Sequence, residues 1–150
     1  MPTFAQIADP HSVFGTHLGY SDWIEITQER INLFADATSD HQWIHVDPER
    51  AAQGPFQTTI AHGYLTLSLA VPAVEQLLRV EGSQMGINYG ANKVRFISPV
   101  PVGSRVRAGA AVAGVADFGG GRAVTLDLTF EVEGTEKPAC VAQVIFRIYG

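Results

Sequence analysis

The sequence lacks the features that mark several classes of protein. Its one cysteine, Cys140, cannot form an internal disulfide, so we expect a reducing compartment and a cytoplasmic location. The ten Lys and Arg residues form no cluster and the formal net charge is −5, which argues against nucleic acid as a partner. The N-terminus has no basic stretch followed by an apolar run, so no signal peptide is expected.

A membrane-spanning helix is also not expected. The longest apolar stretch runs from Tyr64 to Val80, but Thr, Ser, Pro, Glu, Gln and Arg residues interrupt it. A bilayer span needs about 20 predominantly apolar residues. The composition, 46% hydrophobic and 17% charged, is that of a globular protein, and the length allows an ordinary core. With no internal repeat or linker, residues 1–150 are expected to form a single domain.

The first third of the chain reads as strand, helix and loop. Thr27 suits a helix N-cap because apolar residues recur at helical spacing behind it, and Asp47-Pro48 is typical of a second helix start. The expected elements are a strand over His17–Ile26, a helix over Thr27–Thr38, a loop over Asp40–Val46 and a short helix through Ala52.

Gly63–Val80 is expected to form a long helix. Its first half is apolar on nearly every side, so it must be enclosed. Pro72 removes one intrahelical hydrogen bond, and a kink is expected there.

From Lys93 onward apolar residues alternate with polar ones in four stretches, ending near Ile148. This period of two, with glycine-rich turns at 119–121 and 134, predicts an antiparallel sheet with one wet face. The fold class is therefore α+β, with the sheet curled around the long helix. One curled sheet would leave one side of the helix open, so two copies are expected to pair as a homodimer.

Asp40 and His45 are candidate acid–base residues. They lie five residues apart in an expected loop, where a carboxylate and an imidazole can converge. The alternative is structural: Asp40 caps a turn and His45 packs against Trp43.

A metal site is the less favoured use of the same segment. His41 and His45 have the spacing His-x3-His, but the zinc-protease form of that spacing needs a glutamate where Gln42 stands, and a helix. No metal is expected.

A second motif, Ile60-Ala61-His62-Gly63, opens the long helix. A glycine there lets a ligand approach the backbone, and the free amides of a helix start can polarise a carbonyl. The alternative is that Gly63 only permits close packing, and His62 itself reads as structural. We include all four as candidate substrate-binding residues.

The segment Gly86-Ile87-Asn88-Tyr89-Gly90 has two interpretations. Its two glycines favour an irregular or bulged strand start. Alternatively, Gly86, Ile87, Asn88 and Tyr89 line a pocket for an acyl chain beside the long helix.

Together with Val94-Arg95-Phe96-Ile97-Ser98-Pro99-Val100-Pro101-Val102-Gly103, the two histidine motifs give the chain a resemblance to the MaoC-like dehydratases, over roughly residues 10 to 149. The similarity is greatest to (R)-specific enoyl-CoA hydratases of the hydratase-2 type. The family usually has Gly-Asp-x-Asn-Pro-(Leu/Ile)-His, whereas this chain has Ser39-Asp40-His41-Gln42-Trp43-Ile44-His45. Trp43 and His41 are thus placed to alter the mouth of the site.

The resemblance implies a hot-dog homodimer acting on coenzyme A or acyl-carrier-protein thioesters in fatty-acid metabolism. It implies catalytic roles for Asp40 and His45, a thioester-oxygen contact for the Gly63 amide, and no organic cofactor. The expected reaction is reversible addition of water to a trans-2-enoyl thioester, giving the (R)-3-hydroxyacyl thioester. A hot-dog thioesterase and a non-catalytic acyl-CoA-binding module are the alternatives.

Overall fold

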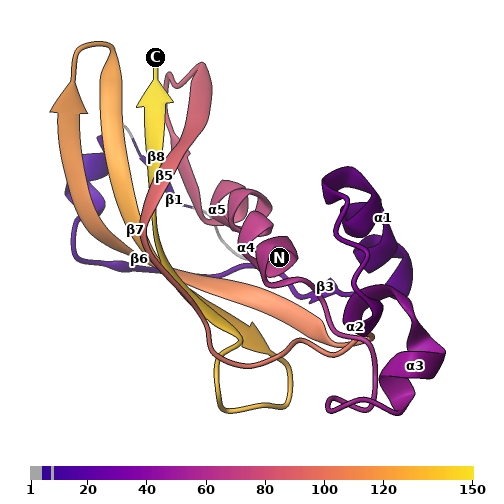
Figure 1. Ribbon diagram of the computed structural model, residues 1–150. Coiled ribbons are helices and arrows are strands. Elements are labelled where there is room, and N and C mark those ends of the chain that lie inside the picture. Colours follow the sequence, from indigo (N-terminus) through magenta and orange to yellow (C-terminus); the bar gives the residue numbers. More distant parts are fainter. Residues whose placement is uncertain (1–4, 8) are drawn as a thin grey trace.

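A curled antiparallel sheet encloses a central helical segment in the computed structural model, which describes residues 5–7 and 9–150. Figure 1 shows the central helices α4 and α5 in the hollow of the sheet, with α1, α2 and α3 grouped beyond them and away from the β6–β7 hairpin. The expected α+β class and the sheet curled around a helix are therefore confirmed.

The sheet is built from six strands. Five of them have the spatial order β2-β6-β7-β8-β5, and β3 also pairs with β6. All the pairs in this sheet are antiparallel. The strands are β2 (His17–Tyr20), β3 (Ile24–Glu25), β5 (Met85–Phe96), β6 (Arg105–Phe118), β7 (Gly121–Val132) and β8 (Cys140–Tyr149). A separate parallel pair joins β1 (Ala5–Ile7) to β4 (Leu78–Val80).

Two strands differ from the sequence prediction. The expected strand over 17–26 is divided into β2 and β3, which both pair with β6. β5 begins at Met85, eight residues before the predicted start at Lys93. Register shifts between Asn88 and Gly90 and between Ala91 and Lys93 interrupt the alternation, which is why the sequence pattern hid this half of the strand. The bulged-strand interpretation of residues 86–90 is thus confirmed.

The N-terminal helices begin where the capping residues predicted. Thr27 Oγ1 accepts a hydrogen bond of 3.1 Å from the amide of Arg30 at the start of α1 (Gln28–Thr38), and Asp47 Oδ1 does the same for the amide of Arg50 in α3 (Pro48–Ala52). A 3-10 helix, η1 (Pro10–Val13), precedes β2. The expected loop over 40–46 is wrong in part, because Trp43–Val46 form a one-turn helix, α2.

The central helix is broken three residues before its proline. α4 (Gly63–Ser68) ends at Leu69, whose amide bonds to Thr66 O at 3.1 Å, and α5 (Ala70–Leu77) begins there. Pro72 thus lies in the first turn of α5, where an amide hydrogen is not needed. The predicted kink at Pro72 is misplaced, and so is the predicted helix end, since residues 78–80 form β4.

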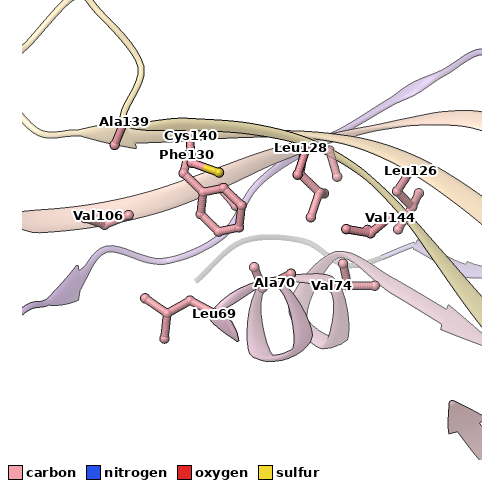
Figure 2. Packing of buried hydrophobic residues seen from close by; sticks show 14 of the residues in the cluster. Leu69, Ala70, Val74, Val106, Leu126, Leu128, Phe130, Ala139, Cys140 and Val144 are labelled. Carbon is pink, nitrogen blue, oxygen red and sulfur yellow. The ribbon is translucent and has the colours of Figure 1, made fainter. Parts of the chain in front are cut away.

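The core lies between the sheet and this helical pair. Figure 2 shows Leu126, Leu128, Phe130 and Val144 of the sheet above Leu69, Ala70 and Val74 of the helices. Burying each large apolar side chain contributes roughly 1.5–3 kcal/mol. Cys140 is part of this core, and burial raises the pKa of its thiol to about 11, so it supplies no thiolate nucleophile at neutral pH.

One side of the helical pair is open, as expected. Tyr64 on α4 and Val71 on α5 are exposed, whereas Leu65, Ala73 and Leu77 are buried. Among the residues that the structure describes, no helix combines the length and apolarity that crossing a membrane requires.

Candidate active site

His45 is buried in α2, and a hydrogen bond to the main chain fixes the orientation of its ring. The side chain is 7% exposed, and Nδ1 lies 2.7 Å from the carbonyl oxygen of Ile60. Because a carbonyl only accepts, Nδ1 must carry the proton. In the neutral ring Nε2 then holds a lone pair, which is the form a general base requires.

A partly buried hydrogen-bond network supports this position of His45. Gln28 Nε2 donates to the His45 carbonyl oxygen at 2.8 Å, and the hydroxyl of the buried Thr59 donates to Gln28 Oε1 at 2.6 Å. The amide of Ile60 donates to the carbonyl oxygen of Ile44 at 3.0 Å. The start of α1 and the segment before α4 are therefore both hydrogen-bonded to the one-turn helix α2. Sequence reasoning missed Gln28 and Thr59, since neither belongs to a motif.

Asp40 follows the end of α1 and is partly open to solvent. The preceding Ser39 adopts the left-handed conformation, φ 63°, which ends the helix and turns the chain. The Asp40 side chain is 52% exposed and accepts a long hydrogen bond, 3.4 Å, from the amide of Gln42. The structure brings Asp40 together with His45 and also with His62: one ligand-type atom from each of the three lies within 4.8 Å of the others.

The surroundings of His45 keep its imidazole neutral. Burial lowers its pKa from 6.5 and the neighbouring His62 ring lowers it further, whereas the hydrogen bond to the carbonyl of Ile60 and the Asp40 carboxylate raise it. Burial dominates, so the pKa is below its ordinary value. A neutral His45 at pH 7 can accept a proton.

Gly63 stands at the first position of α4, beside a cavity of about 260 Å³ that His45 also lines. An amide at the first helical position has no acceptor within its helix, so it is available to a ligand. A Cβ built on Gly63 would lie 3.0 Å from the ring of Phe96, which lines the same cavity. Both interpretations of this glycine, close packing and an accessible amide, therefore agree with the geometry.

Ile60 and Ala61 also line this cavity, whereas His62 is not among its lining residues. The remaining wall comes from Phe56, Thr66 and Ala139, which the sequence did not single out, and from five residues of the third motif, to which it assigned no role: Phe96, Ile97, Ser98, Pro99 and Val100. Thr66, buried in an otherwise apolar helix three residues after Gly63, was the signal that could have identified part of this wall.

The segment 86–89 lies elsewhere. Gly86 and Asn88 line a second and larger cavity, about 620 Å³, together with Val71 and Val74 of α5 and Leu78 of β4. Neither Asp40 nor His45 lines it. Ile87 and Tyr89 are not among its lining residues, and both are exposed. The structure thus separates these four residues from the candidate catalytic pair and divides them between two faces of β5.

The divergent residues His41 and Trp43 do not border the smaller cavity. His41 Nε2 lies 2.8 Å from Asp36 Oδ1 on the surface. Trp43 packs over Gly54, where an added Cβ would meet the indole at 2.8 Å, and the Arg50 guanidinium lies 4.5 Å from the ring centroid. The expectation that they shape the mouth of the site finds no support in these contacts.

Comparison with known proteins identifies the family of the chain. A family model described as "MaoC like domain" matches residues 10–133. The chain is 59% identical over 148 residues to 3-hydroxyacyl-thioester dehydratase Z of Mycobacterium tuberculosis, covering 98% of each chain. It is 48% identical to nodulation protein N of Rhizobium leguminosarum bv. viciae, covering 93% of this chain and 88% of that one.

A solved structure leads to the same family. The (R)-hydratase from A. caviae involved in PHA biosynthesis superposes with a TM-score of 0.74 and 25% identity, covering 89% of this chain and 94% of the other. This similarity confirms the hot-dog arrangement of sheet and helix. From the extent of the family match and of the identity to its relatives, the chain belongs to the MaoC-like dehydratase family.

Proposed function

We propose that the protein is a hydro-lyase that interconverts a trans-2-enoyl thioester and an (R)-3-hydroxyacyl thioester in fatty-acid metabolism. The observation that carries the proposal is the pairing of a buried, neutral His45 with the Asp40 carboxylate, beside a cavity that the Gly63 amide borders. The dehydratase and (R)-hydratase named among its relatives support the reaction type.

In the hydration direction, His45 Nε2 and the Asp40 carboxylate hold the attacking water. One of the two accepts a proton as the water oxygen bonds to C3, and a proton is returned at C2. Electron density moves onto the thioester oxygen in the enolate-like transition state, where the Gly63 amide donates a hydrogen bond. A donor aimed at developing negative charge is worth roughly 3 kcal/mol of barrier in well-measured enzymes. Dehydration follows the same steps in reverse.

The larger cavity is the proposed place for the distal part of the acyl chain, since neither Asp40 nor His45 lines it and the reacting carbons must lie beside that pair. Val71 and Val74 of α5 and Leu78 of β4 give it an apolar wall, and Gly86 leaves space where a side chain would protrude. Narrowing it with Val71→Phe should lower kcat/KM for long enoyl chains and spare short ones. Equal losses at every chain length would place the acyl chain elsewhere.

A homodimer is the proposed assembly. Among the described residues β5 ends the sheet and has one unpaired edge, and Met85, Ile87, Tyr89 and Phe96 on this strand are exposed. An open edge of this length invites pairing with a second copy, and the exposed Tyr64 and Val71 of the central helices would be covered at the same time. Light scattering should give a particle of twice 16.2 kDa. A stable monomer with full activity would contradict this.

The proposed reaction uses no metal and no organic cofactor. His45 Nδ1 and His62 Nε2 are each engaged with a main-chain carbonyl, and His41, the ligand considered with His45, pairs with Asp36 instead. Extensive EDTA treatment should leave hydration unchanged. Activity that is lost and then restored by zinc would assign the cluster to a metal. A cytoplasmic location stays a prediction from the single cysteine.

The decisive experiment is a hydration assay that follows loss of the enoyl-thioester absorbance across chain lengths, with coenzyme A and acyl-carrier-protein substrates in parallel. A thiol reagent in a second sample measures thioester cleavage. Hydration without thiol release is the expected result. Thiol release as the main product would instead identify a hot-dog thioesterase, and neither product would identify a binding module.

A further inference from the structure

His62 contacts both members of the proposed acid–base pair without lining either cavity described above. Its Nε2 lies 3.0 Å from the main-chain oxygen of Asp40 and 4.0 Å from Oδ2 of the same residue. Its ring stacks on that of His45, with centroids 3.9 Å apart and planes inclined by 23°. The side chain is only 3% exposed. Contact with the pair, in the absence of access to the substrate space, is the geometry of a supporting residue.

The hydrogen bond to Asp40 defines which nitrogen of His62 carries a proton. A carbonyl oxygen only accepts, so Nε2 must donate. In the neutral ring Nδ1 then holds a lone pair, and this atom is buried without a hydrogen-bond partner among the described residues. Burying an imidazole nitrogen without a hydrogen-bond partner costs free energy, so space filling alone does not explain a histidine at this position.

The helix start does not explain the imidazole either. His62 is the N-cap residue of α4, a position where Ser, Thr, Asp or Asn usually bond to a free amide, but its side chain makes no capping hydrogen bond. It turns instead toward the end of α1, where Phe34 covers it with a centroid distance of 4.9 Å.

We propose that His62 is a positioning residue for the proposed hydration reaction, on which this inference rests. Its Nε2–H tethers the main chain of Asp40, and its ring fixes the plane of His45. Asp40 needs such a tether, because its half-exposed side chain otherwise has only the 3.4 Å bond from the Gln42 amide among the described residues. Without it, the carboxylate that helps to hold the attacking water would no longer be held against His45. Misplacement of reacting groups by about 1 Å can cost on the order of 10²-fold in rate.

Two substitutions separate the tether from the stack. His62→Phe keeps an aromatic ring against His45 and removes the donor. His62→Gln removes the ring and keeps an N–H at nearly the reach of Nε2. His62→Phe should lower kcat by roughly 10- to 100-fold with little change in KM, and His62→Gln should recover a large part of the loss. If His62 only filled the core, Phe would be the better replacement.

Phe34→Leu is the matched control, because it disturbs the other ring contact of His62 and removes no side-chain hydrogen bond. It should lower Tm while leaving kcat near the wild-type value. Wild-type kcat in His62→Phe, or equal losses in the Phe and Gln variants, would overturn the proposal.

A second readout does not depend on turnover or on the folding of His62→Phe. Long-range ¹H–¹⁵N spectra of the wild-type protein should show the His62 ring protonated at Nε2 and unprotonated at Nδ1. A ring carrying its proton on Nδ1 alone would overturn the tether even if the enzyme is active. Failure of the wild-type protein to hydrate any enoyl thioester would refute the proposed function, and the spectra would still report on the tether.

Discussion

The chain contains the same spacing, Asp-x4-His, twice in overlapping positions. Asp36 and His41 form a direct hydrogen bond of 2.8 Å, with side chains 73% and 53% exposed. Asp40 and His45 have a buried histidine instead, bonded to the main chain at Ile60 and stacked on His62. The two pairs lie four residues apart, and of the four residues only His45 lines one of the two cavities described above.

The difference shows that spacing alone does not make an acid–base pair. At the surface, the two partners of Asp36–His41 satisfy each other, water screens them, and such a pair is worth roughly 0–1 kcal/mol. At the second pair, one imidazole nitrogen of His45 is bonded to a carbonyl and the other can bind a ligand, in surroundings that hold the ring neutral. We attribute the reactivity of this pair to that second nitrogen rather than to the residue types.

The largest expected effect is on turnover when the inner pair is changed. Asp40→Asn and His45→Gln should each lower the hydration rate by a factor of roughly 10² or more, because each removes a proton-transfer group while preserving size. Initial rates with a saturating enoyl thioester measure the change, and circular dichroism verifies the fold.

The outer pair supplies the matched control. Asp36→Asn and His41→Gln make the same chemical changes at the same spacing and should leave the hydration rate near that of the wild-type protein. If the outer variants lost as much activity as the inner ones, the distinction between the two pairs would be refuted. A folded Asp40→Asn with near-normal activity would remove Asp40 from the mechanism.

A smaller effect is expected at the network that supports His45. Thr59→Val removes the hydroxyl that donates to Gln28 Oε1, leaving a partly buried amide oxygen without its donor. The loss of stability should be about 1–3 kcal/mol, visible in urea unfolding. The hydration rate should fall as well, by less than in His45→Gln, because Gln28 also holds the His45 carbonyl.

Thr38→Val provides the comparison on the surface. The Thr38 hydroxyl bonds to the carbonyl oxygen of Phe34 within α1 and is exposed. Its removal leaves no buried group unsatisfied, so both stability and rate should change little. Equal unfolding midpoints for the two variants would show that the buried network does not stabilise the fold.

Sequence patterns predicted the elements whose determinants are local. The caps Thr27 and Asp47 fixed the starts of α1 and α3, and regular alternation after Lys93 identified the second half of the sheet. The failures involve tertiary contacts. The β5 bulges broke the alternation, and residues 78–80 left the helix to pair with β1.

The site, like the fold, was predicted from the sequence only where its determinants are local. Asp40 and His45 were found through their motif, and the structure places them together. The contacts that distinguish this pair from Asp36–His41 come from residues 15 to 22 positions away, at Ile60 and His62. The spacing of residues within one segment cannot predict such contacts. The proposed supporting roles of His62, Gln28 and Thr59 could therefore be recognised only from the folded structure.

The smallest expected effect is on the pH dependence of stability, and it tests whether His45 is held neutral. In the unfolded chain a histidine titrates near 6.5, whereas burial lowers the pKa of His45 in the folded protein. Well above pH 6.5 the His45 ring binds no proton in either the folded or the unfolded state, so it does not change the free energy of unfolding with pH. As the pH falls from 6.5 through the folded pKa, the unfolded chain binds the proton first and the free energy of unfolding decreases. His45→Gln should therefore show a weaker decrease than the wild-type protein in urea titrations between pH 7.5 and 5. Val144→Ala, a core change with no titrating group, should keep the wild-type slope. A steeper decrease in His45→Gln than in the wild-type protein would mean that His45 is protonated in the fold, and it could not then act as the base.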